Sequence, residues 1–409
     1  MDYRPIIIAE TVFSQVTTGV SRYINLWIEE LIRLKYKVVY FRFEYNLDSL
    51  FVYEQIQQDY VQVSIPLPED VLGVFANGVH LKAYFNVIYP IIKKFFSDYS
   101  VFHIHSPELY GLAELAKQDF NLSTILHLHS IPWRNLYNTN KTLFYDLHRK
   151  YTSKEKIQPR DFFTVLNEEE GYKSSDEIIC VTEMGRKFLK RMEVDEHKLH
   201  VIYNGLNQTN AIVTKRDYKI DTTPKAIFVG GLRESKGLDF VLQAILRVQQ
   251  YGYELSLSIA GYADEEKRKS ISEAYPSLSL EFLGNLPFHQ LYECYNTADL
   301  GLIASLQEQC SYAAIEMMMS GLPIISTNAD GLDEMFTHGK DALIVPVLET
   351  NDGIIPDVNE MVIHLVRLIN DYMLRKHIGE GAKRRSAEQF SFSEMFNRTI
   401  NIYNTYVSS

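Results

Sequence analysis

The chain has 409 residues, which at roughly 100–200 residues per domain allows two or three domains. A hydrophobic fraction of 46% and a charged fraction of 23% are ordinary for a packed globular protein and exclude an intrinsically disordered or fibrous chain. The net charge of −11, from 41 basic and 52 acidic residues, argues against a general nucleic-acid-binding protein.

The first half of the chain alternates short apolar runs with amphipathic stretches, which is typical of β–α–β units and parallel sheets. The predicted strands are 5–9, 37–43, 101–105, 123–129, 177–182 and 199–203. The predicted helices are 20–34, 81–96 and 184–191. Residues 131–176 break the alternation and are rich in aromatic side chains, and a segment of this length between strands is either functional or mobile.

The second half repeats the pattern after a polar stretch, 206–224, that we interpret as a linker. The predicted strands are 225–229, 255–260, 279–283, 299–304, 323–327 and 342–345, and the predicted helices are 237–250, 263–275, 287–296 and 311–320. Residues 391–407 form a further amphipathic helix. The chain therefore predicts an α/β fold of two doubly wound domains of about 200 residues each.

The cysteine content and the apolar runs of the sequence indicate where in the cell the protein is expected. The three cysteines show no CxxC spacing, so neither a zinc knuckle nor a disulfide framework is expected, and reduced thiols suit a cytoplasmic protein. No run of 18 apolar residues predicts a transmembrane helix. Residues 81–96 carry aromatic side chains beside Lys93 and Lys94, which suits peripheral contact with the inner face of a membrane, but Pro90 interrupts them and a core-packed helix is the preferred interpretation.

A glycine-rich turn, Gly230–Gly237, follows one apolar strand and precedes a helix. Glycines let a backbone approach a ligand closely, and Arg233 and Lys236 add positive charge, so the turn is either a phosphate cradle or an ordinary β–α turn with solvated charges. The spacing matches neither GxGxxG nor GxxxxGK[ST], which argues against a nicotinamide-dependent oxidoreductase and a P-loop nucleotidase.

Two carboxylates, Glu308 and Glu316, lie eight positions apart after the strand 299–304. A helix beginning near Ser311 places Glu308 in the preceding loop and Glu316 in the second turn, at the carboxyl ends of the strands, where doubly wound sheets bind ligands. The backbone N–H groups of Ser311 and Tyr312 then face a phosphate, and the carboxylates accept hydrogen bonds from sugar hydroxyls. The alternative is a capped helix with solvated glutamates.

Four histidines end two neighbouring strands: His103 and His105 on one, His127 and His129 on the other. Strand alternation places each pair on one face. A metal site is one interpretation. Because no Asp or Glu lies beside them at ligand spacing, buried and hydrogen-bonded histidines are the preferred interpretation, and we expect no metal ligands.

At these motifs the sequence resembles the retaining, nucleotide-sugar-dependent family 4 glycosyltransferases. Glu308–Glu316 matches the family's E-x7-E motif, and Phe228–Gly237 matches its phosphate-binding loop. The remaining matches are Asp176–Thr182, Val201–Gly205, Gly321–Pro323, Gly331–Glu334, Thr18–Ser21 and His129. The resemblance implies a GT-B fold: an acceptor-side domain at 1–205 and a donor-binding domain at 206–386, facing a central cleft, with a C-terminal helix at 387–409 crossing back to pack on the first domain.

The resemblance also implies roles for single residues. Lys236 would neutralise the donor diphosphate, Glu316 would hold the ribose, and Glu308 would contact the donor sugar. Gly19 would let its loop close over the donor, and His129 would hydrogen-bond the sugar from the acceptor side. The implied donor site is completed by Gly230, Gly231, Arg233, Ser311 and Tyr312.

Two residues depart from the family pattern. The family has arginine where this chain has Gly231, and Arg233 is the candidate replacement. The family has glycine where this chain has Ser311. These departures motivate an alternative function, a catalytically degenerate subunit that binds nucleotide sugars or regulates a partner.

The activity implied is transfer of a sugar with retention at the anomeric carbon. The absence of an Asp-x-Asp motif agrees with metal-independent chemistry, and no cofactor is expected beyond a donor such as a UDP- or GDP-sugar. The acceptor is a glycan, a lipid-linked sugar, a small metabolite or a peptide. We expect residues 131–176, with Trp133 and Tyr137, to shape the acceptor side.

Overall fold

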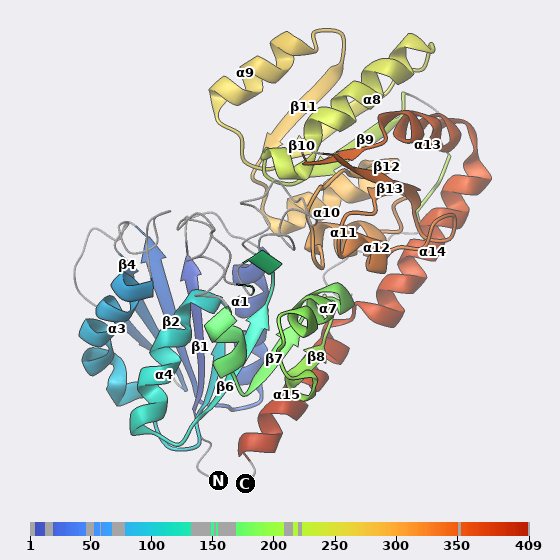
Figure 1. Ribbon diagram of the computed structural model, residues 1–409. Helices are drawn as coiled ribbons and strands as arrows, with labels where there is room; N and C mark the ends of the chain where they lie inside the picture. The colour runs from blue at the N-terminus through green and yellow to red at the C-terminus, as the bar shows by residue number, and fades with distance from the viewer. Residues whose placement is uncertain are drawn as a thin grey trace. The chain divides into compact units, whose positions relative to one another are not determined.

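A computed structural model describes residues 5–12, 19–45, 53–57, 59–67, 78–131, 149–150, 153, 169–207, 216–219, 223–350 and 353–407. These residues form two compact units, each built on its own sheet (Figure 1). Unit 1 comprises the described residues of Met1–Arg134, Lys141–Ile202 and Phe396–Ser409. Unit 2 comprises the described residues of Tyr203–Met395.

The sheet of unit 1 has the strand order β3-β4-β2-β1-β5-β6-β7-β8 in the described residues. Its strands are β1 (Ile6–Val12), β2 (Val38–Tyr45), β3 (Tyr53–Gln57), β4 (Tyr60–Leu67), β5 (Val101–Ile104), β6 (Ser123–Leu128), β7 (Glu177–Cys180) and β8 (Leu199–Val201). Neighbours pair in parallel except at the edge, where β3 is antiparallel to β4. The chain leaves β1 in both directions, which makes the sheet doubly wound.

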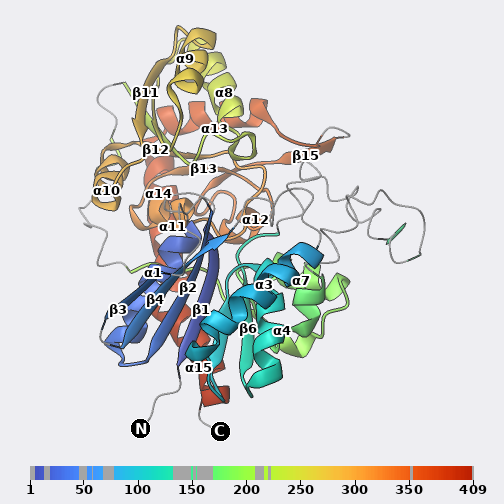
Figure 2. The same cartoon turned by 90° about the vertical axis from the view of Figure 1, so that its left-hand side faces the viewer.

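The helices of unit 1 cover both faces of this sheet. They are α1 (Gly19–Arg33), α3 (Gly78–Ile92), α4 (Tyr110–Asp119), α7 (Glu183–Arg191) and the part of α15 (Phe392–Val407) from Phe396 onward. Figures 1 and 2 show α1 and α15 against one face and α3 and α4 against the other. Because both faces are covered, the inner strands are mostly apolar; Ile6, Ile7 and Ile8 are all completely buried.

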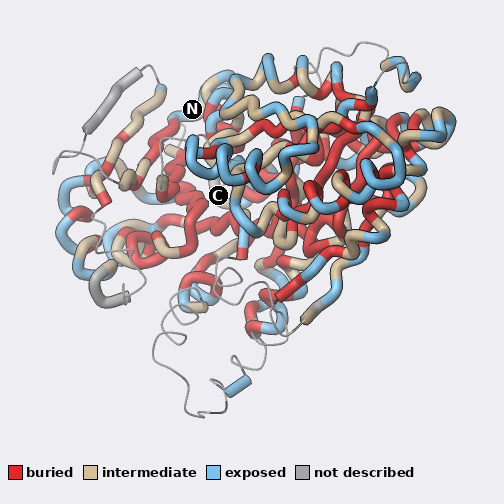
Figure 3. Tube along the Cα trace, turned by 90° about the horizontal axis from the view of Figure 1, so that it is seen from above, coloured by how far each residue is buried: buried red, intermediate tan, exposed pale blue. Residues whose placement is uncertain are grey.

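Buried residues follow the strands, and exposed residues follow the outer sides of the helices (Figure 3). Helix α3 shows this division: Phe85 and Ile92 are fully buried, whereas Val87 and Ile91 lie on the outside. Among the residues that the structure describes, no helix combines the length and the apolar character needed to cross a bilayer.

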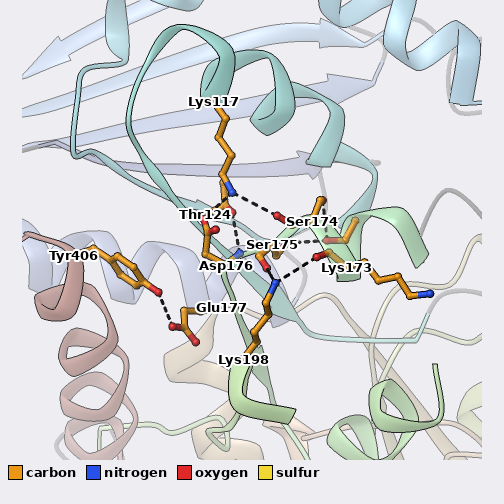
Figure 4. Close-up of polar contacts among 10 residues, drawn as sticks. Lys117, Thr124, Lys173, Ser174, Ser175, Asp176, Glu177, Lys198 and Tyr406 are labelled. Atoms are coloured by element: carbon orange, nitrogen blue, oxygen red, sulfur yellow. Dashed lines mark hydrogen bonds and ion pairs between the residues drawn. The ribbon is translucent and has the colours of Figure 1, made fainter. Parts of the chain in front are cut away.

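A network around Asp176 ties the amino ends of β6 and β7 together (Figure 4). Asp176 Oδ2 accepts hydrogen bonds from the Thr124 backbone N–H at 2.7 Å and from Lys117 Nζ at 2.7 Å. Burial would raise the pKa of Asp176, but these donors outweigh burial and hold it below its usual range. The carboxylate therefore stays ionised and fastens two strands and α4.

The C-terminal helix α15 is anchored on unit 1 by aromatic side chains. Trp27 Nε1 donates to Tyr403 Oη at 3.1 Å, and the Trp27 and Phe396 ring centroids lie 4.4 Å apart. Tyr406 Oη donates to Glu177 Oε1 at 2.6 Å at the far end of the helix (Figure 4). The final residues thus complete the core of the first sheet.

Unit 2 has a six-stranded parallel sheet in the order β11-β10-β9-β12-β13-β14, within the described residues. Its strands are β9 (Lys225–Val229), β10 (Ser256–Ala260), β11 (Ser279–Gly284), β12 (Leu300–Ile303), β13 (Ile324–Thr327) and β14 (Leu343–Val345), with a separate hairpin of β15 (Val347–Thr350) and β16 (Gly353–Pro356). Its helices are α8 (Leu238–Gln250), α9 (Glu265–Ala274), α10 (Phe288–Thr297), α11 (Tyr312–Met319), α12 (Leu332–Met335), α13 (Val358–Asn370) and α14 (Tyr372–Gln389).

Helices α8 and α13 pack side by side on one face of this sheet, whereas α11 packs on the other (Figure 1). Gly301 of β12 permits the close approach of α11, because a Cβ there would lie 2.8 Å from Met317 Sδ. The strand order reverses between β9 and β12, and the carboxyl ends of the strands at such a reversal are where doubly wound sheets bind ligands.

All the predicted strands and helices are present, with ends that differ by a few residues. The sequence analysis missed β3, β4, α4, α12, α13, α14 and the hairpin of β15 and β16. Strand β4 lies near the sheet edge and buries only alternate residues, so it lacks the continuous apolar run by which the inner strands were recognised.

We expect Tyr403→Phe to destabilise the fold by about 1–3 kcal/mol, because Trp27 Nε1 and His103 Nδ1 would lose their buried partner. Tyr406→Phe, one turn further along α15, removes a half-buried hydrogen bond and should cost about 1 kcal/mol or less. Urea unfolding of both variants measures the difference. Equal losses would contradict the anchoring role of Tyr403.

Candidate functional site

The loop after β9 is shaped by close backbone contacts with the loop after β12. Gly237 has a φ of 70°, and a Cβ there would lie 2.1 Å from the Ala304 carbonyl oxygen. The Leu306 N–H donates to Ser235 O at 2.8 Å, which joins the same two loops. The sequence-predicted cradle Gly230–Gly237 therefore lies beside the start of the segment that carries Glu308.

Lys236 and Glu308 form an ion pair at this crossing. Lys236 Nζ lies 2.5 Å from Glu308 Oε2, and their side chains are 25% and 18% exposed. The lysine stem packs along Gly230, where an added Cβ would lie 3.5 Å from Lys236 Cγ. The structure thus brings together two predicted site residues that lie 72 positions apart in the chain.

Arg233 lies near the place where the family has an arginine side chain. A Cβ added to Gly231 would lie 3.8 Å from Arg233 Nε. The Arg233 N–H donates to Gly231 O at 2.8 Å, so the backbone turns sharply instead of running on in an extended form. In an extended strand, two positions would separate the Arg233 side chain from position 231 by about 6–7 Å, and this turn offsets that separation.

Helix α11 begins where the E-x7-E motif predicts. Ser311 is its N-cap, with a side chain that accepts from the Ala314 N–H, and Tyr312 is the first helical residue. The first N–H groups of a helix have no partner within the helix and favour anions. The Ser311 N–H donates to Met335 Sδ at 3.3 Å, and sulfur is a weak acceptor.

Glu316 lies in the second turn of α11 and is 2% exposed. Its Oε2 accepts a hydrogen bond of 2.6 Å from Tyr295 Oη on α10. Tyr295 itself is fully buried, so the carboxylate is held in one orientation. The sequence analysis did not identify Tyr295; its position on the inner side of the predicted helix 287–296 was the available signal.

His129 and Gly19 belong to unit 1. Gly19 is the exposed first residue of α1. His129 follows β6, is half-buried, and its Nε2 lies 2.8 Å from His105 Nδ1. Burial lowers the pKa of His129 to about 3, so the imidazole is neutral near pH 7. The acceptor-side candidates Trp133 and Tyr137 lie outside the described residues.

Unit 1 also holds two acids that the sequence analysis missed, one buried and one partly buried. Glu10, at the end of β1, is 2% exposed and accepts hydrogen bonds from Tyr40 Oη and Ser21 Oγ. Glu108, in the short helical turn after β5, accepts a hydrogen bond of 2.5 Å from Thr11 Oγ1. Burial raises the pKa of both carboxyl groups. They flank the point where the order of the first sheet reverses, between β1 and β5.

Each of the two units matches a known protein family. Residues 17–209 match the family described as Glycosyltransferase Family 4, and residues 223–371 match the family described as Glycosyl transferases group 1. The chain belongs to these glycosyltransferases. It is 26% identical over 246 residues to an uncharacterized glycosyltransferase of Methanocaldococcus jannaschii, a match that covers 57% of this chain and 60% of that protein. The chain spans about three-fifths of the length of the curated relatives it matches.

Solved structures show the same fold at low sequence identity. Sucrose-phosphate synthase from Thermosynechococcus elongatus matches 99% of this chain with a TM-score of 0.77 at 16% identity, and 100% of that chain is covered. Anabaena HepE, solved in complex with UDP-glucose, matches 98% of this chain and 100% of its own with a TM-score of 0.67 at 14% identity. The predicted GT-B fold of two Rossmann-like units is confirmed, with the addition that the first sheet carries an antiparallel edge strand.

We expect Gly237→Ala to destabilise the chain by about 3 kcal/mol or more, because the positive φ and the contact with Ala304 O both oppose a Cβ. Gly252→Ala is the matched control: its φ of 84° is also positive, but nothing lies within 4 Å of the added Cβ, so about 1 kcal/mol is expected. Urea unfolding compares the two variants. A smaller loss for Gly237→Ala than for Gly252→Ala would show that the loop does not depend on this contact.

Proposed function

We propose that this protein transfers a sugar from a nucleotide diphosphate sugar to a hydroxyl acceptor, with retention at the anomeric carbon and without a metal ion in the transfer step. The observation that carries the proposal is the Lys236–Glu308 pair at the carboxyl ends of β9 and β12. Family membership supports sugar transfer. A UDP- or GDP-sugar is the proposed donor, and the UDP-glucose complex of the structurally similar HepE supports the former.

The main task in this reaction is to stabilise the charge that grows on the departing diphosphate. Lys236 supplies a full positive charge, and the first turn of α11 supplies backbone N–H groups and the positive end of the helix dipole. Arg233, exposed beside Gly231, adds a second cation within the same loop. These fixed groups can do the work that a divalent ion does in other transferases.

Lys236 and Glu308 satisfy each other when no donor is bound. A diphosphate would draw Lys236 away, because two phosphates carry more charge than one carboxylate. Glu308 would then be released to accept hydrogen bonds from the hydroxyls of the donor sugar. Donor binding would therefore replace the Lys236–Glu308 ion pair by two new contacts, one between Lys236 and the diphosphate and one between Glu308 and the sugar hydroxyls.

Glu316 is the proposed ribose ligand. Tyr295 holds its Oε2, and the carboxylate is the proposed acceptor for hydrogen bonds from the ribose hydroxyls. Because the side chain is buried and held, little conformational entropy is lost when it binds.

The proposed transfer breaks the bond from the anomeric carbon to the diphosphate oxygen, and the electron pair leaves with the diphosphate. The acceptor oxygen forms the new bond on the same face, and its proton passes to the departing phosphate oxygen. His129, neutral near pH 7, would donate or accept a hydrogen bond with the sugar without adding charge. The proposed acceptors are a glycan, a lipid-linked sugar, a small metabolite or a peptide, bound with the help of Trp133 and Tyr137.

A second candidate is a nucleotide-sugar-binding subunit without turnover. Gly231, which lacks the family's arginine side chain, is the observation that favours it. The return of Arg233 towards Gly231 weighs against it, because a guanidinium is still available at that position. The two candidates differ in turnover but not in donor binding.

We expect a UDP- or GDP-sugar, added without metal, to raise the melting temperature of the chain selectively. A ligand at 100 times its Kd stabilises a fold by about 2.7 kcal/mol. Glu316→Gln should abolish the shift, since the amide still accepts from Tyr295 but loses the charge and one acceptor oxygen. Tyr295→Phe is the control and should keep most of the shift. No shift with any nucleotide sugar would contradict the proposed donor site.

We expect Lys236→Ala to lower kcat by about 10²–10³ while the chain stays folded, because one fixed cation is lost from the leaving group. Release of nucleoside diphosphate measures the rate, with Lys267→Ala, an exposed lysine on α9, as the control. Turnover close to wild type in folded Lys236→Ala would overturn the assignment. If the wild-type chain binds the donor but releases no nucleoside diphosphate with any acceptor, the second candidate, a nucleotide-sugar-binding subunit without turnover, is favoured.

A further inference from the structure

Four histidines of unit 1 gather on one face of its sheet. His103 lies on β5, with His105 just beyond that strand, whereas His127 lies on β6, followed by His129. Strands β5 and β6 run parallel, with Ile104 opposite Leu126, so the next residues, His105 and His127, lie side by side. Their ring centroids are 5.2 Å apart, and His103 lies 4.2 Å from His105.

Three of these rings are buried among aromatic side chains. His103, His105 and His127 are 0%, 4% and 1% exposed, and the Tyr23 ring covers His105 and His127 at 5.5 and 4.8 Å. Imidazole offers a lone pair to a metal ion in its neutral form, and an apolar, buried environment favours that form.

Four of the six ring nitrogens of His103, His105 and His127 have a partner among the described residues, and two do not. Within the cluster, His127 Nδ1 lies 3.3 Å from His103 Nε2, a contact that a bound ion would replace. His103 Nδ1 lies 2.5 Å from Tyr403 Oη, and His105 Nδ1 lies 2.8 Å from His129 Nε2. Nε2 of His105 and Nε2 of His127 have no hydrogen-bond partner among the described atoms of the chain. A buried polar atom left in this way costs about 1–3 kcal/mol, so two such atoms in one cluster point to a missing ligand.

One ring nitrogen from each of His103, His105 and His127 lies within 4.8 Å of the others. In the described part of the chain, no other group of histidine, cysteine or carboxylate side chains meets this condition. Tetrahedral zinc with bonds of about 2.0–2.1 Å needs nitrogens about 3.3 Å apart. The rings are tilted by only 18–36° to one another, so their in-plane lone pairs run nearly parallel, and the rings must turn about χ2 to direct one nitrogen each at a single ion.

We propose that His103, His105 and His127 bind one late first-row divalent metal ion, with zinc as the simplest occupant. Three neutral imidazoles and no carboxylate suit zinc, copper or nickel and do not suit magnesium or calcium. Tyr403 and His129 would serve as outer partners that hold the ligand rings, as is usual at metal-bound histidines. The ion would clamp β5 to β6, and its presence does not depend on the proposed transferase activity. This proposal departs from the sequence-based expectation of no metal ligands.

The first test uses the full chain without a histidine tag. The chain is incubated with zinc, freed of excess metal by gel filtration and analysed by elemental mass spectrometry; we expect about one zinc per chain. Cobalt in place of zinc should give the visible absorption bands of a four-coordinate ion with nitrogen ligands. Less than about one-tenth of an ion per chain, with no cobalt bands, would overturn the proposal.

Variants then locate the ion. His127→Gln should lose the bound zinc and the cobalt bands, and Tyr403→Phe should weaken binding by about 10–100-fold through loss of an outer partner. His200→Gln, a half-exposed histidine paired with Glu177 in the same unit, should keep one ion. Circular dichroism identifies variants that fail to fold. If a variant does not fold, the proposal is judged by whether the wild-type chain gives the cobalt bands. Zinc retained by folded His127→Gln, or lost from His200→Gln, would place the ion elsewhere and refute the proposal.

Discussion

The reversal of strand order at β9 and β12 is the constraint on which the donor side of this protein depends. Parallel strands end at one edge of the sheet, and β9 and β12 are neighbours in it, so the loops that follow them begin side by side at that edge. Gly237 then allows the two loops to touch at Ala304. That contact brings Lys236 to Glu308, three residues before the N-cap of α11. The charges are therefore arranged by topology before any ligand is present.

The same arrangement bears on which ligand fits. An anion alone would take Lys236 and leave Glu308 half-buried without its cation, which is costly. A neutral sugar alone would have to compete with Lys236 for the Glu308 carboxylate. The proposed donor, with a diphosphate beside sugar hydroxyls, would compensate both partners at once, and Glu316 is the proposed acceptor for the ribose hydroxyls. We infer that the resting ion pair favours a whole nucleotide sugar over a free phosphate.

Much of this arrangement was predictable from the sequence, because buried parallel strands are read directly from apolar runs and the N-cap of α11 is a local signal. Other features were not. Strands β3 and β4 lie at a sheet edge, where burial is partial and the apolar signal is weak. The bond from Tyr295 to Glu316 depends on how α10 packs against α11, and the return of Arg233 to Gly231 depends on one sharp turn. Such contacts arise from packing and leave no spacing pattern.

The histidine cluster shows the same limit. Strand alternation predicted that each pair shares a face, but only the register of β5 against β6 places His105 beside His127. Tyr403 reaches His103 from 300 positions away, by way of the helix that closes unit 1. An ion held there would fix His105, and through its Nδ1 it would fix the ring of His129. The proposed metal ion would thus orient the proposed sugar-binding histidine while taking no part in the transfer, so the proposed metal site is compatible with the proposed metal-independent transfer.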